Sequence, residues 1–432
     1  MANIVIRDIV DNVLIANIFS MIVDETQDLS RHEQVAIILR YVNTDFCPIE
    51  ALLGFYIVES TDGLTLSLLI KNVLNSNGLQ LECLRGQCYD GAASMRGAYK
   101  GVQSRIKEEN SLASYVHCNA HILNLCLVDL SKQISHVRNV FGTLSNLHNF
   151  IKASSKRQAV FDNMRSKLNM KMGDGPSTLK SLSDTRWSCR IDALESLIFN
   201  DQVVIDSLEN ISENDSIHGS DHMTKATIQE LSNMRCEDRF DVIWCKANVM
   251  RIDHYKINIY FQILDTIISD MKERFNENDI HILNCMQDII VNEPIKFTSY
   301  QDVSTMYGFN ESELKSETKI FNRMYKSLNT ENTVQSNIKY MRSGDNAVGF
   351  PTFAKLYKPF LTIPSNSAAC ERSFSCLRRL KNYLRITMGQ SRLNHLGILQ
   401  IERERSLNIN KDEVIKQFDS STIPCRLKFN NF

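Results

Sequence analysis

Alternating or continuous apolar segments dominate the first 130 residues of the chain. Three runs rich in Ile, Val, Phe and Tyr are separated by polar turns, which is typical of consecutive strands. These runs lie at 18–25, 33–42 and 52–60. The next segment has helical spacing and the stop signal Asn77-Gly78. This segment is predicted to be a helix at 64–79. A strand at 81–91, a helix at 98–110 and a strand that leads into a helix at 114–127 follow it.

Helical spacing replaces this pattern from about 131 to 350. In 255–275, apolar residues return every three or four positions, as on one face of an amphipathic helix. The polar, Ser- and Asp-rich segment 209–224 is predicted to be a surface loop. Strands alternating with helices, followed by a long helical segment, indicate an α/β part and then an all-helical part.

A last helix follows a proline-punctuated apolar stretch at 350–364. Its predicted apolar stripe consists of Phe374, Leu377, Leu380 and Leu384. Glu371 stands three residues before Phe374, so this carboxylate is predicted to lie on the inward face, with Arg372, Arg379 and Lys381 on flanking or outer faces. The predicted organisation is therefore 1–130, 131–350, 351–410 and a tail at 411–432.

Composition narrows the class of protein only slightly. The 432 residues are 43% hydrophobic and 23% charged, as in an ordinary folded protein, and the net charge is −1. No apolar run is long enough to span a membrane, and the N-terminus lacks the features of a signal peptide, so an intracellular protein is expected. The 12 cysteines form no paired Cys-x-x-Cys motifs, and no zinc site is predicted. Residues 372–405 hold eight Lys or Arg against two Glu, which suits either a solvated helix face or a phosphate-binding surface.

Three acidic residues are candidate metal ligands. Asp24 and Asp90 each follow an apolar strand, and Glu371 opens the late helix. Each has a structural alternative: both aspartates suit turns, and Glu371 suits the positive end of a helix dipole, although Ala368 excludes a capping box. If the two strand ends meet, the three acids form a set of oxygen ligands that Mg²⁺ prefers in two-metal phosphoryl transfer.

Five motifs in order carry a resemblance to the hAT superfamily of transposases. They are "FSMIVDETQDLSRHEQVAIILRYV", "GQCYDGAASMRG", "HCNAHILNL", "DTRWSCR" and "SNSAACERSFSCLRRLKNYLRITMGQSRLNHLGIL". They are most similar to the branch that includes MYM-type zinc-finger and protein-kinase-inhibitor-repressor-like host proteins. The resemblance covers about 15 to 405. It implies an RNase H-like mixed sheet interrupted by a large all-α insertion, followed by a C-terminal helical dimerisation region.

The resemblance also assigns roles to individual residues. It implies that Asp24, Asp90 and Glu371 form a DDE triad that binds Mg²⁺ or Mn²⁺ and cuts and joins DNA. Arg186 and Trp187 match an Arg-Trp motif that holds a base turned out of the duplex, although Trp187 equally suits the core of the insertion. Arg372 and Arg379 are further candidates for DNA binding. Cys118 and His121 match a Cys-x-x-His motif, which we interpret as packing or support of the active site because two ligands do not complete a zinc site.

Two departures from the family pattern favour an alternative without catalysis. Family members usually carry an N-terminal zinc-finger module, whereas only 23 residues precede Asp24. The insertion also looks short after the Arg-Trp motif. The alternative is a truncated or domesticated protein that dimerises and binds DNA or protein in the nucleus. Either interpretation implies a homodimer or higher oligomer and DNA as a partner, with no membrane and no small-molecule substrate.

Overall fold

A computed structural model gives the fold of the chain. It describes residues 1–168, 175–182, 188–213, 256–275, 277–291, 295–328, 333–343 and 346–421. Contacts divide the chain into two compact units, 1–121 with 276–432, and 122–275. The predicted insertion, 131–350, is longer than the second unit, because the helices from 277 onward pack with the first unit.

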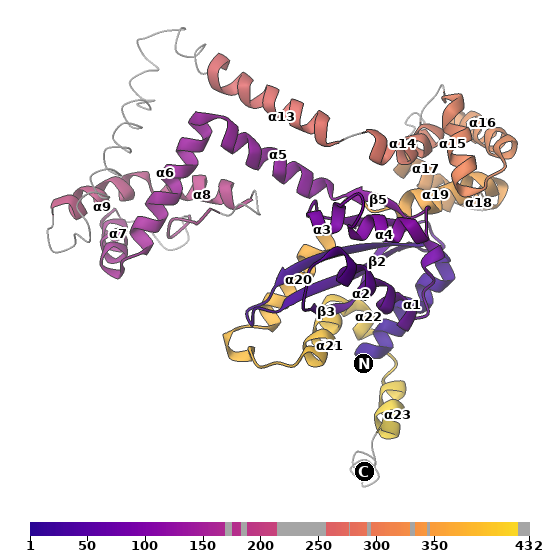
Figure 1. The fold of residues 1–432 in the computed structure, drawn as a ribbon, viewed down its shortest axis with the longest axis horizontal. Coiled ribbons are helices and arrows are strands. Elements are labelled where there is room, and N and C mark those ends of the chain that lie inside the picture. The colour runs from indigo at the N-terminus through magenta and orange to yellow at the C-terminus, as the bar shows by residue number, and fades with distance from the viewer. Residues whose placement is uncertain are drawn as a thin grey trace. The chain divides into compact units, whose positions relative to one another are not determined.

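Five strands form one mixed sheet in the order β3-β2-β1-β4-β5 (Figure 1). Their bounds are β1 Phe19–Gln27, β2 Glu33–Val42, β3 Pro48–Val58, β4 Leu84–Tyr89 and β5 Ser114–His117. β1 pairs antiparallel with β2 and parallel with β4, and β4 pairs parallel with β5. All five predicted strands are therefore present, and the predicted α/β class with a mixed sheet is confirmed.

Helices of the first unit cover this sheet or follow it. They are α1 Ala2–Ala16, α2 Gly63–Ser76, α3 Ala93–Arg96, α4 Val102–Glu109 and the start of α5 Asn119–Gln133, then α14 Glu277–Val291, α15 Phe297–Tyr307, α16 Glu311–Leu328, α17 Val334–Arg342, α18 Asn346–Gly349, α19 Pro351–Thr362, α20 Ala368–Leu380, α21 Gln390–Ile401, α22 Arg403–Leu407 and α23 Lys411–Ser421. Helix α1 was not predicted, although Val5, Ile9 and Val13 recur at four-residue spacing and are buried in the core.

The second unit consists of helices in its described part. They are the rest of α5, then α6 Ser135–Lys152, α7 Ser155–Lys167, α8 Ser188–Phe199, α9 Asp201–Glu213 and, after a π-helical turn at Lys256–Tyr260, α13 Phe261–Arg274. Its core is a separate cluster that includes Leu147, Phe161 and Val204. The predicted surface loop at 209–224 overlaps α9 as far as Glu213, and the remainder lies outside the described residues.

Two hydrophobic cores stabilise the first unit. The larger one joins the strands to α1, α2, α4, α20 and α21. The second gathers apolar residues of α14–α19 around Phe321 and Phe353, and it includes Val42 and Phe46 from the end of β2 and the turn after it. Because α19 also contacts β1, β2 and β4, these helices are anchored to the sheet. In the described part of the chain, no helix is long and apolar enough to cross a membrane.

Candidate carboxylate site at the sheet edge

Asp24 and Asp90 lie at matching positions of two parallel strands. Ile22 of β1 is the register partner of Cys88 of β4, and each aspartate follows two residues later. The parallel pairing of β1 with β4 ends at these partners, so both carboxylates lie just beyond it, Asp24 within β1 and Asp90 directly after β4. Asp90 is also a turn residue, because its Oδ1 accepts the backbone N–H of Ala92 at 3.1 Å. The turn interpretation of Asp90 is therefore confirmed, and its role as a metal ligand stays a prediction.

Glu371 reaches the same edge from α20, but its side chain is exposed. The buried face of α20 is formed by Cys370, Ser373, Phe374 and Leu377. The prediction that Glu371 lies on the inward face is therefore wrong: the position four residues before Phe374, Cys370, is the buried one, and its Sγ contacts the carbonyl of Ile22 at 3.6 Å. The predicted stripe is also wrong at Leu384, which lies beyond the helix and is 94% exposed.

The charges of Asp90 and Glu371 both act on Asp24, so the three acids are neighbours. Burial, as the largest cause, and the neighbouring charges of Asp90, Glu371 and Cys118 together raise the pKa of Asp24 to about 8, although the hydrogen bond from the N–H of Glu25 opposes them. Burial together with the charges of Asp90 and Glu33 raises the pKa of Glu25 to about 7. Like charges this close disfavour ionisation unless a cation neutralises them.

Glu25 is a site residue that sequence reasoning missed. Side chains alternate along a strand, so a residue next to Asp24 ordinarily belongs to the other face of the sheet. Its Oε2 is buried and has no hydrogen-bond partner among the described residues. The only signal in the sequence was its position in "VDET", directly after Asp24.

The donor set at this edge suits Mg²⁺ or Mn²⁺. All candidate ligands are carboxylates, and the unpartnered oxygen of Glu25 marks a place where a cation would replace lost hydration. The oxygens of Asp24, Asp90 and Glu371 are not all within 4.8 Å of one another; among the described residues, only His281, Cys285 and Asp302 form such a group. Of the three acids, Glu371 is the one whose side chain is exposed.

Cys118 lies level with the two aspartates at the end of the next strand. It follows by two residues Val116, the register partner of Cys88. The Sγ of Cys118 accepts the backbone N–H of Ser367 at 3.2 Å, which links β5 to the residue before α20. A hydrogen bond from the Cys88 thiol, with others from Ser367 and His121, lowers the pKa of Cys118 to about 5, although burial opposes it. This environment fits support of the site.

The basic residues of α20 divide into two groups. Arg372 and Arg379 are exposed and line one pocket of about 370 Å³, where an Arg372 guanidinium nitrogen lies 3.4 Å from Oε2 of Glu50. Lys381 is only 3% exposed, so its prediction as an outward residue is wrong. It pairs with a buried aspartate instead, and the basic surface of this segment is smaller than its charge count suggested.

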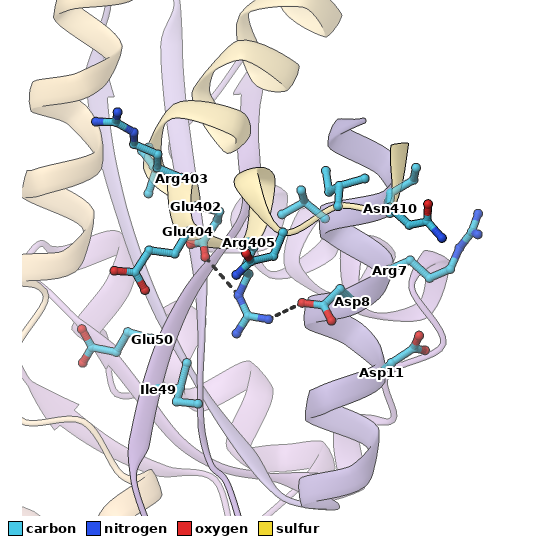
Figure 2. A pocket seen from close by; sticks show the side chains of 15 residues that line it. Arg7, Asp8, Asp11, Ile49, Glu50, Glu402, Arg403, Glu404, Arg405 and Asn410 are labelled. Atoms are coloured by element: carbon cyan, nitrogen blue, oxygen red, sulfur yellow. Dashed lines mark hydrogen bonds and ion pairs between the residues drawn. The ribbon is translucent and has the colours of Figure 1, made fainter. Parts of the chain in front are cut away.

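A larger pocket, of about 1000 Å³, lies away from the carboxylates. It is bounded by α1, the start of β3 and the segment from α21 through α22 to residue 410 (Figure 2). Arg405 crosses it and forms ion pairs with Asp8 and, at 3.3 Å, with Glu402. These pairs connect α1 to the C-terminal helices and stabilise the walls of the pocket. None of the predicted site residues that the structure describes lines it.

Arg186 and Trp187 lie outside the described residues. The proposed base-holding role of these two residues therefore stays a prediction.

Two family models match the chain. Residues 1–101 match the family described as ZMYM1/FAM200, RNase-like domain, and residues 324–404 match the hAT family C-terminal dimerisation region. The first match contains Asp24 and Asp90, and the second contains Glu371. The two domains predicted from the motifs are thus present in the chain.

Similar curated proteins extend this result along the chain. The human and the mouse proteins named 52 kDa repressor of the inhibitor of the protein kinase are each 22% identical to it over 494 aligned residues. The alignments cover 94% of this chain but 65% of each relative, so the chain spans about two thirds of their length. The resemblance to the hAT-derived branch is confirmed.

Proposed function

From a hAT-derived chain that combines an RNase-like domain with a hAT C-terminal dimerisation region, we infer a dimerising nuclear protein that processes DNA. In this proposal Asp24, Asp90 and Glu371 hold Mg²⁺ or Mn²⁺. The observation that carries it is the register of β1 and β4, which places Asp24 and Asp90 at matching positions, where the charges of Asp90 and Glu371 help to raise the pKa of Asp24. Acids that share one edge raise the cost of ionising Asp24, which disfavours the folded state unless a cation binds there.

The chain's own groups have separate tasks in this proposal. A bound divalent ion would supply Lewis-acid activation of the attacking and leaving oxygens of a phosphodiester. Asp24 and Asp90 would hold it from the rigid sheet, and the exposed Glu371 would close on it from the first turn of α20. Arg372 and Arg379, on the outer side of α20, would contact backbone phosphates of the same duplex. Arg186 and Trp187 are proposed to hold a base beside the cut.

A cleavage assay with purified chain tests the catalytic part. The substrate is a pre-nicked terminal-repeat duplex, with Mg²⁺ or Mn²⁺ in one series and a chelator in the other. Asp90→Asn is expected to abolish metal-dependent cleavage, whereas Asp11→Asn, an exposed acid of α1, is expected to leave it unchanged. Absent cleavage in the unaltered chain, or cleavage that survives Asp90→Asn, would contradict the assignment.

A second candidate function omits the chemistry. The relatives bear the name of a repressor, and the oxygens of Asp24, Asp90 and Glu371 are not gathered within 4.8 Å, which together favour a dimerising regulatory factor that binds DNA or protein. In that case the chain would bind duplex DNA with unchanged affinity after Asp90→Asn and would show no cleavage. Binding affinity and cleavage measured on the same samples separate the two functions.

A further inference from the structure

Three side chains of different chemistry converge where α14 packs on α15. His281 and Cys285 are four residues apart on α14, so they lie on one face of that helix, and Asp302 comes from α15. Nε2 of His281 lies 3.0 Å from Oδ2 of Asp302 and 3.5 Å from Sγ of Cys285. The same Sγ lies 3.8 Å from Oδ2 of Asp302. The three atoms therefore form a triangle with sides of 3.0, 3.5 and 3.8 Å.

This triangle has the dimensions of one face of a zinc coordination shell. Zinc bonds of about 2.0–2.3 Å to nitrogen, oxygen and sulfur, at tetrahedral angles, place neighbouring ligand atoms roughly 3.4–3.6 Å apart. Of the two distances from Cys285 Sγ, 3.5 Å lies within that range and 3.8 Å lies slightly above it. The distance between His281 and Asp302 is shorter, 3.0 Å, because these two groups hydrogen-bond directly. An ion would enter by moving the two side chains apart by a few tenths of an ångström.

The surroundings of the triangle have the layout of a metal site with one open position. Cys285 is buried at the base, whereas the side chains of His281 and Asp302 are 61% and 41% exposed at the rim. Asp288 lies one turn further along α14, and its Oδ2 accepts a hydrogen bond from the hydroxyl of Ser299 at 3.3 Å. A buried thiol, an exposed imidazole and a carboxylate thus leave the solvent side free for a water ligand.

We propose that His281, Cys285 and Asp302 form a Zn²⁺ site that joins α14 to α15, with water as the fourth ligand. Binding releases the proton of the Cys285 thiol to solvent, so the thiolate, the neutral imidazole and the carboxylate become the three protein ligands. A thiolate and an imidazole favour Zn²⁺ over Mg²⁺, whereas the all-carboxylate edge of the sheet has the opposite preference. The site is therefore independent of the proposed DNA-processing function.

Metal titration of the full chain, freed of any affinity tag and of metal by chelation, tests this proposal. Zn²⁺ is titrated in competition with a chromogenic chelator, and Co²⁺ replaces it as a spectroscopic probe. We expect one Zn²⁺ per chain, and Co²⁺ spectra with a thiolate charge-transfer band and the intense visible bands of tetrahedral geometry. Cys285→Ser should remove the charge-transfer band, and His281→Ala and Asp302→Asn should each weaken Zn²⁺ binding at least about tenfold.

Matched controls exclude other thiols and imidazoles. Cys83→Ser, at a half-buried cysteine, and His148→Ala, at a half-buried histidine, should leave the affinity and the spectrum unchanged. Circular dichroism of each variant confirms that it is folded. The proposal is overturned if the unaltered chain binds no Zn²⁺ at micromolar concentration, or if folded Cys285→Ser keeps the charge-transfer band. It is also overturned if the Cys83→Ser control loses that band.

Discussion

The ammonium group of Lys381 lies 2.6 Å from Oδ2 of Asp28, and both side chains are almost completely buried. Asp28 directly follows β1, which carries Asp24, and Lys381 directly follows α20, which carries Glu371. The ion pair therefore fixes the end of α20 against the end of β1, although the two residues are 353 positions apart in the sequence. It is a structural support of the carboxylate site that charge counting alone assigned to the surface.

Removing Lys381 should strongly destabilise the first unit. Lys381→Met leaves the carboxylate of Asp28 buried without its cation, and breaking a buried pair by deleting one partner costs about 3–5 kcal/mol. We expect the lower end of that range, because Asp28 keeps hydrogen bonds from the backbone N–H of Ser30 and from Gln34. Urea denaturation of the variant and of the unaltered chain measures the loss.

The double variant Lys381→Met with Asp28→Asn is the control for this prediction. It removes both charges, so it should be more stable than Lys381→Met alone. A double variant that is less stable than the single one would show that the pair is not the source of the loss.

Acid should weaken the fold through Asp28. Burial raises the pKa of this carboxyl, but hydrogen bonds from Lys381, Gln34 and the N–H groups of His32 and Ser30 together hold it below its ordinary value. The folded state then binds fewer protons than the unfolded chain, so the stabilisation is present above about pH 4 and is lost as the pH falls through the folded pKa. Unfolding free energies measured from pH 6 to pH 2 should fall less steeply in Asp28→Asn. Equal slopes in the two proteins would contradict the assignment.

A methyl group at Gly397 should disrupt the packing of α21 on the sheet. A Cβ there would meet the ring of Phe55 at 2.7 Å, and that ring lies against Phe374. Overpacking of a core costs about 1–3 kcal/mol, so Gly397→Ala should lower the urea midpoint accordingly. Gly349→Ala is the control in the same unit, because a Cβ there meets nothing within 4 Å. Its stability should change by less than about 0.5 kcal/mol.

Dimerisation should depend on the apolar turn after α20. Tyr383 and Leu384 lie within the segment matched to the dimerisation region, and they are 82% and 94% exposed. If this turn is part of the interface, Leu384→Asp should raise the dimer dissociation constant roughly 30-fold or more, as for an interface hot spot. Sedimentation equilibrium measures it. Ile198→Asp, at a 72% exposed residue of α8 outside the match, is the control and should leave the constant unchanged.

Local patterns predicted the sheet well because most of its strands contain a long buried, apolar stretch. The residues from Phe19 to Val23 of β1 are buried without exception, and such a run has few alternatives. Helix α1 was not predicted, even though its apolar residues have helical spacing, because the acids among them were interpreted only as evidence against a signal peptide. In α20, counting three residues back from Phe374 predicted that Glu371 points inward. Residues both three and four apart can share a helical face, and here the residue four positions back, Cys370, is the buried one.

By itself, the sequence determined the order of strands and helices, the α/β class and the choice of Asp24, Asp90 and Glu371 as candidate ligands. These depend on periodicity and on motifs, which are local. Only the tertiary structure decided that Glu25 joins the acids, that Lys381 is buried beside Asp28, and that Asp302 meets His281 and Cys285. Each of these depends on which distant segments pack together, and the burial that results changes the charge and hydrogen bonding of side chains whose own neighbours in sequence give no sign of it.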